Sequence, residues 1–176
     1  MLTVVASLLI VQAVAASPVC SSELPVNIQP GLFRPEMVRL LEQSRTSRQQ
    51  CTRIAAARYV RVVFGVALTV PDGARAQSVI ERFEAGAIVA HVTLKFSEDY
   101  LEIIPHELEH VIEQIERVQL RKEVAAQRAW EGKGGAFETK RAIEAGIRVR
   151  QEVDALAVEA IQADTRKPPA PRHPIH

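Results

Sequence analysis

Five consecutive residues, His106-Glu107-Leu108-Glu109-His110, hold the side chains in this chain best suited to chemistry. At about 3.6 residues per helical turn, positions i and i+4 share one face, so His106 and His110 can present two imidazole nitrogens to one metal ion. Glu107 lies about 100° further round the helix, where it can reach a water on that metal without binding the metal. Two nitrogen ligands, an open coordination position and a neighbouring base are what metal-dependent hydrolysis requires.

The residues around this motif predict an amphipathic helix whose motif faces away from its core-facing side. His106, His110 and Glu113 fall on one side of the helical projection. The opposite side is apolar and comprises Leu101, Ile104, Leu108, Val111, Ile112 and Ile115. A merely solvated face would show the same pattern, so the stripe alone does not establish a metal site. Ser97 marks a helix start, and Pro105 predicts either a kink or a start at that residue.

The H-E-x-x-H pattern resembles the active-site helix of the zincin metallopeptidases. This resemblance implies Zn²⁺ as the cofactor, His106 and His110 as ligands, Glu107 as the general base and a peptide or protein as the substrate. The Gly and third His that follow the motif in metzincins are absent, and the next His is His173. The resemblance therefore points to the gluzincin branch, in which a Glu from a later helix is the third ligand.

Glu138 is the first candidate for the third ligand. A long helix is predicted from about residue 136 to 163, and its apolar stripe, projected back by one turn, meets Glu138. A carboxylate in phase with a buried stripe needs a partner, which a metal would supply. The alternative is an exposed first-turn acid stabilised by the helix dipole. Glu152, at the edge of the stripe, is the second candidate.

Two further residues are weaker candidates for the site. Glu113 lies about 7–8 Å along the helix axis from the expected metal position, which suits a contact with a ligand or with substrate rather than with the metal. Tyr100 is the nearest residue that could donate to an oxyanion.

The remaining pattern predicts a small α+β domain of zincin type over residues 35–164, with a short antiparallel or mixed sheet. A helix is expected from Pro35 to about residue 57, and apolar alternation predicts strands over residues 59–70 and 87–96. Residues 74–84 fit either a short helix or a hairpin strand. The strand over 87–96 resembles, in its sequence position, the zincin edge strand that pairs with extended substrate.

Composition and the chain ends favour an exported protein. The chain has 176 residues, 47% of them hydrophobic, and a net charge of +1, which argues against a nucleic-acid or polybasic membrane surface. Residues 1–16 fit a signal peptide, although no Lys or Arg precedes the apolar run and a buried helix is the alternative. Two cysteines, Cys20 and Cys51, then suggest a disulfide. Residues 17–34 read as an extended lead-in and residues 165–176 as a disordered, Pro-rich tail.

These features predict a periplasmic or secreted zinc metallopeptidase without a membrane anchor once the signal is removed. The stretches around residues 106–114 and 137–142 also resemble uncharacterised exported bacterial proteins of zincin type. The alternative is an exported envelope or interaction domain with a structural or vestigial metal, whose site would be closed by a fourth protein ligand. The sequence leaves substrate, activity and oligomeric state open.

Overall fold

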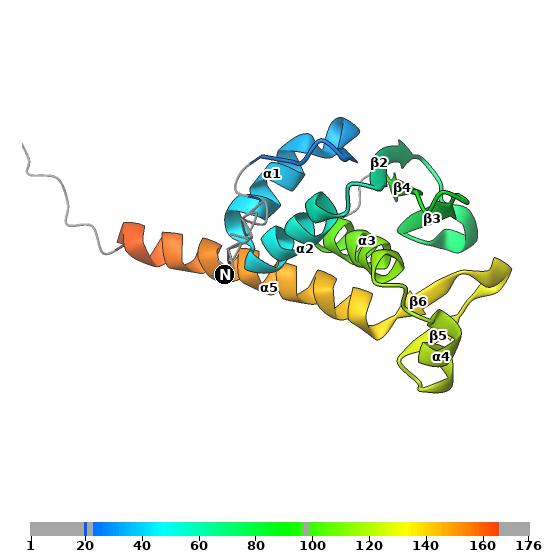
Figure 1. Ribbon diagram of the computed structural model, residues 1–176. Helices are drawn as coiled ribbons and strands as arrows, with labels where there is room; N and C mark the ends of the chain where they lie inside the picture. Colours follow the sequence, from blue (N-terminus) through cyan, green and yellow to red (C-terminus); the bar gives the residue numbers. More distant parts are fainter. Residues whose placement is uncertain (1–19, 21–22, 97–98, 166–176) are drawn as a thin grey trace, which may run out of the picture.

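The computed structural model describes residue 20 and residues 23–96 and 99–165 (Figure 1). The predicted signal peptide and residues 166–176 of the predicted tail lie outside the described residues. The elements follow one another as β1 (Ile28–Gln29), η1 (Gly31–Phe33), α1 (Arg34–Gln43), α2 (Arg45–Ala56), β2 (Val60–Ala67), η2 (Pro71–Gly73), β3 (Ala76–Arg82), β4 (Ile88–Lys95), α3 (Tyr100–Ile115), α4 (Leu120–Ala125), β5 (Ala129–Glu131), η3 (Lys133–Gly135), β6 (Phe137–Thr139) and α5 (Lys140–Thr165).

The chain is a small α+β domain with a mixed sheet of strand order β1-β2-β4-β3. β1, β2 and β4 run parallel, with Val60 opposite Ile88, and β3 pairs antiparallel with β4. Residues 74–84 therefore provide a hairpin strand and not a helix. The prediction that residues 87–96 form an edge strand is wrong, because β4 lies between β2 and β3; among the described strands, β3 is at that edge.

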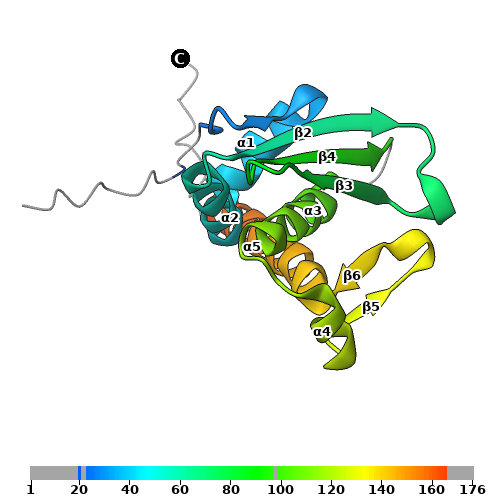
Figure 2. The same cartoon turned by 45° about the vertical axis from the view of Figure 1, so that its right-hand side comes forward.

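Helix α3 lies between the sheet and α5, as Figure 2 shows. Its apolar side packs against the inward-facing residues of β2 and β4, which include Val62, Phe64, Ala90, Val92 and Leu94. The other side is not simply solvated. Glu107, Glu109 and Glu113 are only 6%, 5% and 2% exposed. Buried carboxylates need partners, so this helix has a polar interior face rather than a water-facing one.

α5 approaches α3 closely at one glycine. A Cβ atom built on Gly146 would lie 2.7 Å from the carbonyl oxygen of Glu102 and 3.4 Å from the Cβ of His106. Real Cβ atoms do not tolerate the first of these distances without movement of the backbone. Gly146 therefore sets how near α5 can come to the helix that carries the two histidines.

The predicted helix from Pro35 to residue 57 is broken in two at Ser44. Ser44 has an extended backbone, with φ −126° and ψ 125°, and its side chain accepts a hydrogen bond from the amide of Ser47. Ser is a preferred N-cap because its hydroxyl satisfies an amide that a helix start leaves unpaired. α3, by contrast, continues through Pro105 and begins behind the Asp99 cap, whose carboxylate accepts from the amide of Leu101.

The segment before α5 also differs from the prediction. The long helix begins at Lys140, and residues 137–139 form β6, which pairs antiparallel with β5. Glu138 is therefore on a strand and not in the first turn of a helix. Thr139 closes the strand and caps α5, because its hydroxyl accepts a hydrogen bond from the amide of Ala142 at 3.0 Å.

Cys20 and Cys51 form a disulfide, with Cα atoms 5.9 Å apart. The bond joins the lead-in to α2, and both cysteines are buried with Leu41 in a small separate cluster. Within the described part of the chain, no helix has both the length and the apolar character needed to cross a membrane.

Candidate metal centre

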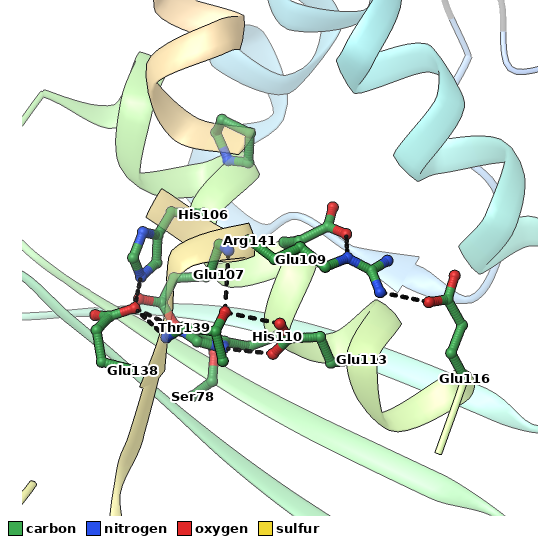
Figure 3. A network of polar contacts seen from close by, with 12 residues as sticks. Ser78, His106, Glu107, Glu109, His110, Glu113, Glu116, Glu138, Thr139 and Arg141 are labelled. Atoms are coloured by element: carbon green, nitrogen blue, oxygen red, sulfur yellow. Dashed lines mark hydrogen bonds and ion pairs between the residues drawn. The ribbon is translucent and has the colours of Figure 1, made fainter. Parts of the chain in front are cut away.

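Three side chains converge on one point from two separate segments (Figure 3). His106 and His110 come from α3, and Glu138 comes from β6. The carboxylate Oε1 of Glu138 lies 3.3 Å from Nε2 of His106 and 3.5 Å from Nε2 of His110. Each residue offers one donor atom, and the three atoms lie within 4.8 Å of one another. Ligand atoms of a tetrahedral zinc ion are about 3.3 Å apart, so this donor set fits the ion.

The second ring nitrogen of His110 is held by a buried carboxylate. Nδ1 of His110 lies 3.1 Å from Oε2 of Glu113, and the hydroxyl of Thr139 donates to the other oxygen of Glu113 at 2.7 Å. When Nδ1 carries the proton and donates to Glu113, the lone pair is on Nε2, which faces Glu138 and His106. Glu113 therefore orients His110, which is the first of the two roles expected for it, contact with a ligand or contact with substrate. Thr139 links the carboxylate of Glu113 to the start of α5.

The centre is strongly negative apart from its histidines. Burial lowers the pKa of His110, but the carboxylates of Glu113 and Glu138 and the charge of Glu107 outweigh it and raise that pKa to about 10. Burial raises the pKa of Glu138, yet His106 and His110 bring it down to about 2. Without a metal, the carboxylates thus retain a proton on His110 at neutral pH. The same charges would attract a divalent cation in its place.

Glu107 faces a different neighbour from the two histidines. The hydroxyl of Ser78, on β3, donates to Oε2 of Glu107 at 2.5 Å. Glu107 does not belong to the group of three donors around Glu138. Its carboxylate is therefore fixed on the β3 side of the centre, while Glu138 closes the β6 side.

A third buried carboxylate of α3 points away from the histidines and connects helices. Glu109 accepts from Gln50 Nε2 of α2 at 2.7 Å and from Arg141 Nε of α5 at 2.6 Å. Arg141 also pairs with Glu116 at 2.5 Å. Arg141 is three residues beyond Glu138, so these pairs help to fix the start of α5 against α3.

An open cavity of about 330 Å³ lies on this Glu109 side of α3, between α2 and α5, and not at the histidines. Its lining mixes Arg and Glu side chains that largely pair with one another, among them Arg53, Arg141, Glu109 and Glu116. The convergence of His106, His110 and Glu138 gives a more specific chemical indication than the volume of this cavity does.

Two sequence candidates are placed elsewhere. Glu152 is not the third ligand: its carboxylate accepts hydrogen bonds from the Ser44 hydroxyl at 2.5 Å and from the amide and hydroxyl of Thr46. It therefore joins α5 to the start of α2. The ring of Tyr100 packs edge-on against Phe33, with centroids 4.9 Å apart, and borders the apolar core, so the assignment to an oxyanion is not supported.

Ser78, Thr139 and Arg141 belong to the site or its support, and none was identified from the sequence. Two of them carried a usable signal. In a strand, Ser78 shares a face with the apolar residues Ala76 and Ile80, so it is a polar residue on an otherwise apolar face. Thr139 is a preferred capping residue and comes directly before the basic start of a helix. Arg141 carried none, because a helical arginine among charged neighbours usually faces solvent.

Comparison with protein-family models, with curated proteins and with solved structures gives no match for this chain.

Proposed function

We propose that this protein is a zinc-dependent peptidase that acts outside the cytoplasm, with His106, His110 and Glu138 as metal ligands. The observation that carries the proposal is the approach of one Glu138 oxygen to Nε2 of both histidines, at 3.3 and 3.5 Å, from a different segment of the chain. The i, i+4 spacing of two histidines would by itself also fit a solvated helix face. A carboxylate from another segment that lies close to Nε2 of both histidines is better explained by a shared cation.

The donor set also bears on the kind of metal site. Among the described residues, three His or carboxylate side chains form the group, whereas a structural zinc usually has four protein ligands. Three protein ligands leave one coordination position for water or substrate. A bound zinc ion supplies Lewis acidity there, making water a better nucleophile near pH 7 and polarising a carbonyl.

The surroundings of Glu107 support its assignment as the general base. It is adjacent to His106 in sequence but outside the ligand group, and its carboxylate is buried and held by Ser78. We assign it to accepting the proton of the attacking water and passing it to the leaving amine. The hydrogen bond from Ser78 limits the rotation of this carboxylate, which favours one orientation toward the water.

Substrate would bind along β3. β3 is the edge strand next to the centre, and its residue Ser78 contacts Glu107. An extended peptide that adds to this edge by backbone hydrogen bonds would pass directly beside the proposed base. This assignment replaces the expected pairing with residues 87–96, because both neighbours of β4 are already paired with it.

The test is metal content and peptidase activity in matched variants of the purified mature protein. Wild type should contain about one zinc per chain, and His110→Ala should lose it. Glu107→Gln should retain zinc and lose at least about 10²-fold in peptidase rate. Glu144→Gln, at an exposed position on α5, is the control and should change neither quantity.

Each result has a clear reading. Zinc content that is unaffected by His110→Ala rejects the metal centre. Peptidase activity that is unchanged in Glu107→Gln rejects Glu107 as the base. A wild-type protein that holds zinc but has no peptidase activity is instead the non-catalytic metal-binding domain. Loss of zinc in Glu107→Gln would make Glu107 a ligand.

A further inference from the structure

We propose that Trp130 is a substrate-contacting residue beside the metal centre, and that its indole binds an aromatic or large aliphatic side chain of the peptide. This inference rests on the peptidase function proposed above. It assigns a specificity to a residue that is neither a ligand nor a base.

The strand register places Trp130 next to the third ligand. Trp130 is directly opposite Glu138 in the β5–β6 pair. Directly opposite residues of an antiparallel pair project from the same face, with Cβ atoms about 4.5–5.5 Å apart. The carboxylate of Glu138 reaches His106 and His110 from that face. The indole therefore starts from the same face of the hairpin, beside the metal centre.

The burial of the hairpin supports a role other than core packing. The neighbouring pair, Ala129 and Thr139, projects from the opposite face and is 4% and 2% exposed. Trp130 is 46% exposed. Tryptophan is the largest apolar side chain, and burial of its surface is strongly favourable. The hairpin has one buried face but leaves nearly half of Trp130 exposed, so apolar surface of the indole is available for a ligand.

The two sides of the centre define where that ligand would pass. Ser78 on β3 contacts Glu107, and Glu138 on β6 contacts the histidines. In both views the β5–β6 hairpin projects from the start of α5 on the same side of the molecule as β3 (Figures 1 and 2). A peptide extended along the edge of β3 would thus have the hairpin on its other side. Its successive side chains point in alternate directions, so one beside the metal would meet the indole.

The chemistry of this contact favours uncharged side chains. The carboxylates of Glu107, Glu113 and Glu138 surround the histidines and would repel an acidic residue of the substrate. The charges of Glu113 and Glu138 are partly offset by the histidines that contact them. The indole of Trp130 therefore offers mainly apolar area to a substrate side chain. Aromatic and large aliphatic side chains gain most from such a surface.

Peptide binding to zinc-loaded Glu107→Gln protein tests the inference, because binding is then measured without cleavage. The probes are blocked peptides of equal length that carry Phe, Leu, Ala, Lys or Asp at one scanned position. Trp130 is the only tryptophan of the chain, so its emission reports the contact directly. At one position, the Phe peptide should bind about tenfold more tightly than the Ala peptide and shift the emission to shorter wavelength.

The added substitution Trp130→Ala should abolish this preference, measured by calorimetry, while zinc affinity stays unchanged. Phe96→Ala, at an aromatic residue that is 62% exposed and lies just after β4, is the control and should retain the preference. Three outcomes would each overturn this inference but leave the proposed peptidase function standing. They are equal affinity for the Phe and Ala peptides, a preference for Lys, and a Phe preference that survives Trp130→Ala. A zinc-loaded protein that binds none of the peptides would overturn the proposed peptidase function, and this inference with it.

Discussion

The hydroxyl of Thr139 donates to the carboxylate of Glu113 at 2.7 Å and accepts from the amide of Ala142 at 3.0 Å. One side chain therefore both holds the carboxylate that contacts His110 and caps α5. Glu113 is 2% exposed, and its other oxygen lies 3.1 Å from Nδ1 of His110. The orientation of His110, a proposed ligand, is thereby coupled to the start of α5, which follows the proposed third ligand Glu138.

Thr139→Val should weaken zinc binding by about 10- to 100-fold, because it removes the Thr139 hydrogen bond that holds Glu113 in place and so loosens the ring of His110. Thr139→Ser keeps the hydroxyl and should bind zinc within a few-fold of wild type. Competition with a chelator of known affinity measures both variants, and circular dichroism checks that each is folded. Wild-type affinity in a folded Thr139→Val protein would show that this hydrogen bond does not position the ligand.

Gly146→Ala should destabilise the protein although alanine is the better helix former by about 1 kcal/mol. The added Cβ would stand 2.7 Å from the Glu102 carbonyl oxygen, which forces α5 away from α3. Such overpacking costs about 1–3 kcal/mol of unfolding free energy. The movement would also displace Glu138 from the histidines, so zinc affinity should fall together with stability.

Ala157→Gly is the matched control, since Ala157 is exposed on the same helix. It should lower the unfolding free energy by about 1 kcal/mol through helix propensity and leave zinc affinity unchanged. Urea unfolding and zinc titration of the two variants separate the steric effect from the propensity effect. A Gly146→Ala protein that is more stable than wild type would contradict the close approach of the two helices.

Glu152 should stabilise the fold in a manner that depends on pH. Burial raises the pKa of its carboxyl, but the hydrogen bonds from Ser44 and Thr46 outweigh it and lower that pKa below the ordinary 4.5. A carboxyl whose pKa is lower in the folded state stabilises at pH values above its unfolded pKa, and this contribution disappears as the pH falls through the folded pKa. The destabilisation caused by Glu152→Gln should therefore be present at pH 7 and shrink at and below about pH 4.

The expected loss at pH 7 is about 1 kcal/mol, after allowance for solvent screening of a partly exposed carboxylate. Asp154→Asn is the control, because Asp154 is 64% exposed and pairs with Arg150 on the same helix. Denaturant unfolding at pH 7 and pH 3.5 measures both variants. A loss that is equal at the two pH values would mean that the charge of Glu152 does not contribute to stability.

The sequence predicted the residues of the centre better than the elements that carry them. The i, i+4 spacing of His106 and His110 is a local property of one helix, so it could be deduced without tertiary information. Projection of a helical stripe predicts Glu138 at the start of a helix, yet Glu138 lies on a strand. The pairing of β5 with β6, which moves the start of the helix to Lys140, depends on contacts between separate segments. The wrong second choice, Glu152, has the same cause, because its partners Ser44 and Thr46 lie 108 and 106 positions away along the chain.

The burial of α3 on both sides was also outside the reach of periodicity. A polar stripe on a helix ordinarily predicts a face exposed to solvent. Here the polar stripe of α3 faces packed helices instead, with ion pairs and hydrogen bonds between the layers. Gln50 and Arg141, which satisfy Glu109, come from segments on either side of α3 in the sequence. Their contribution becomes visible only when α2 and α5 are in place.

The position of Thr139 and Glu113, 26 positions apart, has a consequence for the order of folding. The two histidines can adopt their spacing as soon as α3 forms, which takes about a microsecond in isolated helices. The carboxylate of Glu138 arrives only after the intervening hairpin has closed and α5 has docked on α3. With the proposed ligands, a nascent chain would offer a two-histidine site first and its full donor set only once β6 is in place, so that tight metal binding would report the completed fold.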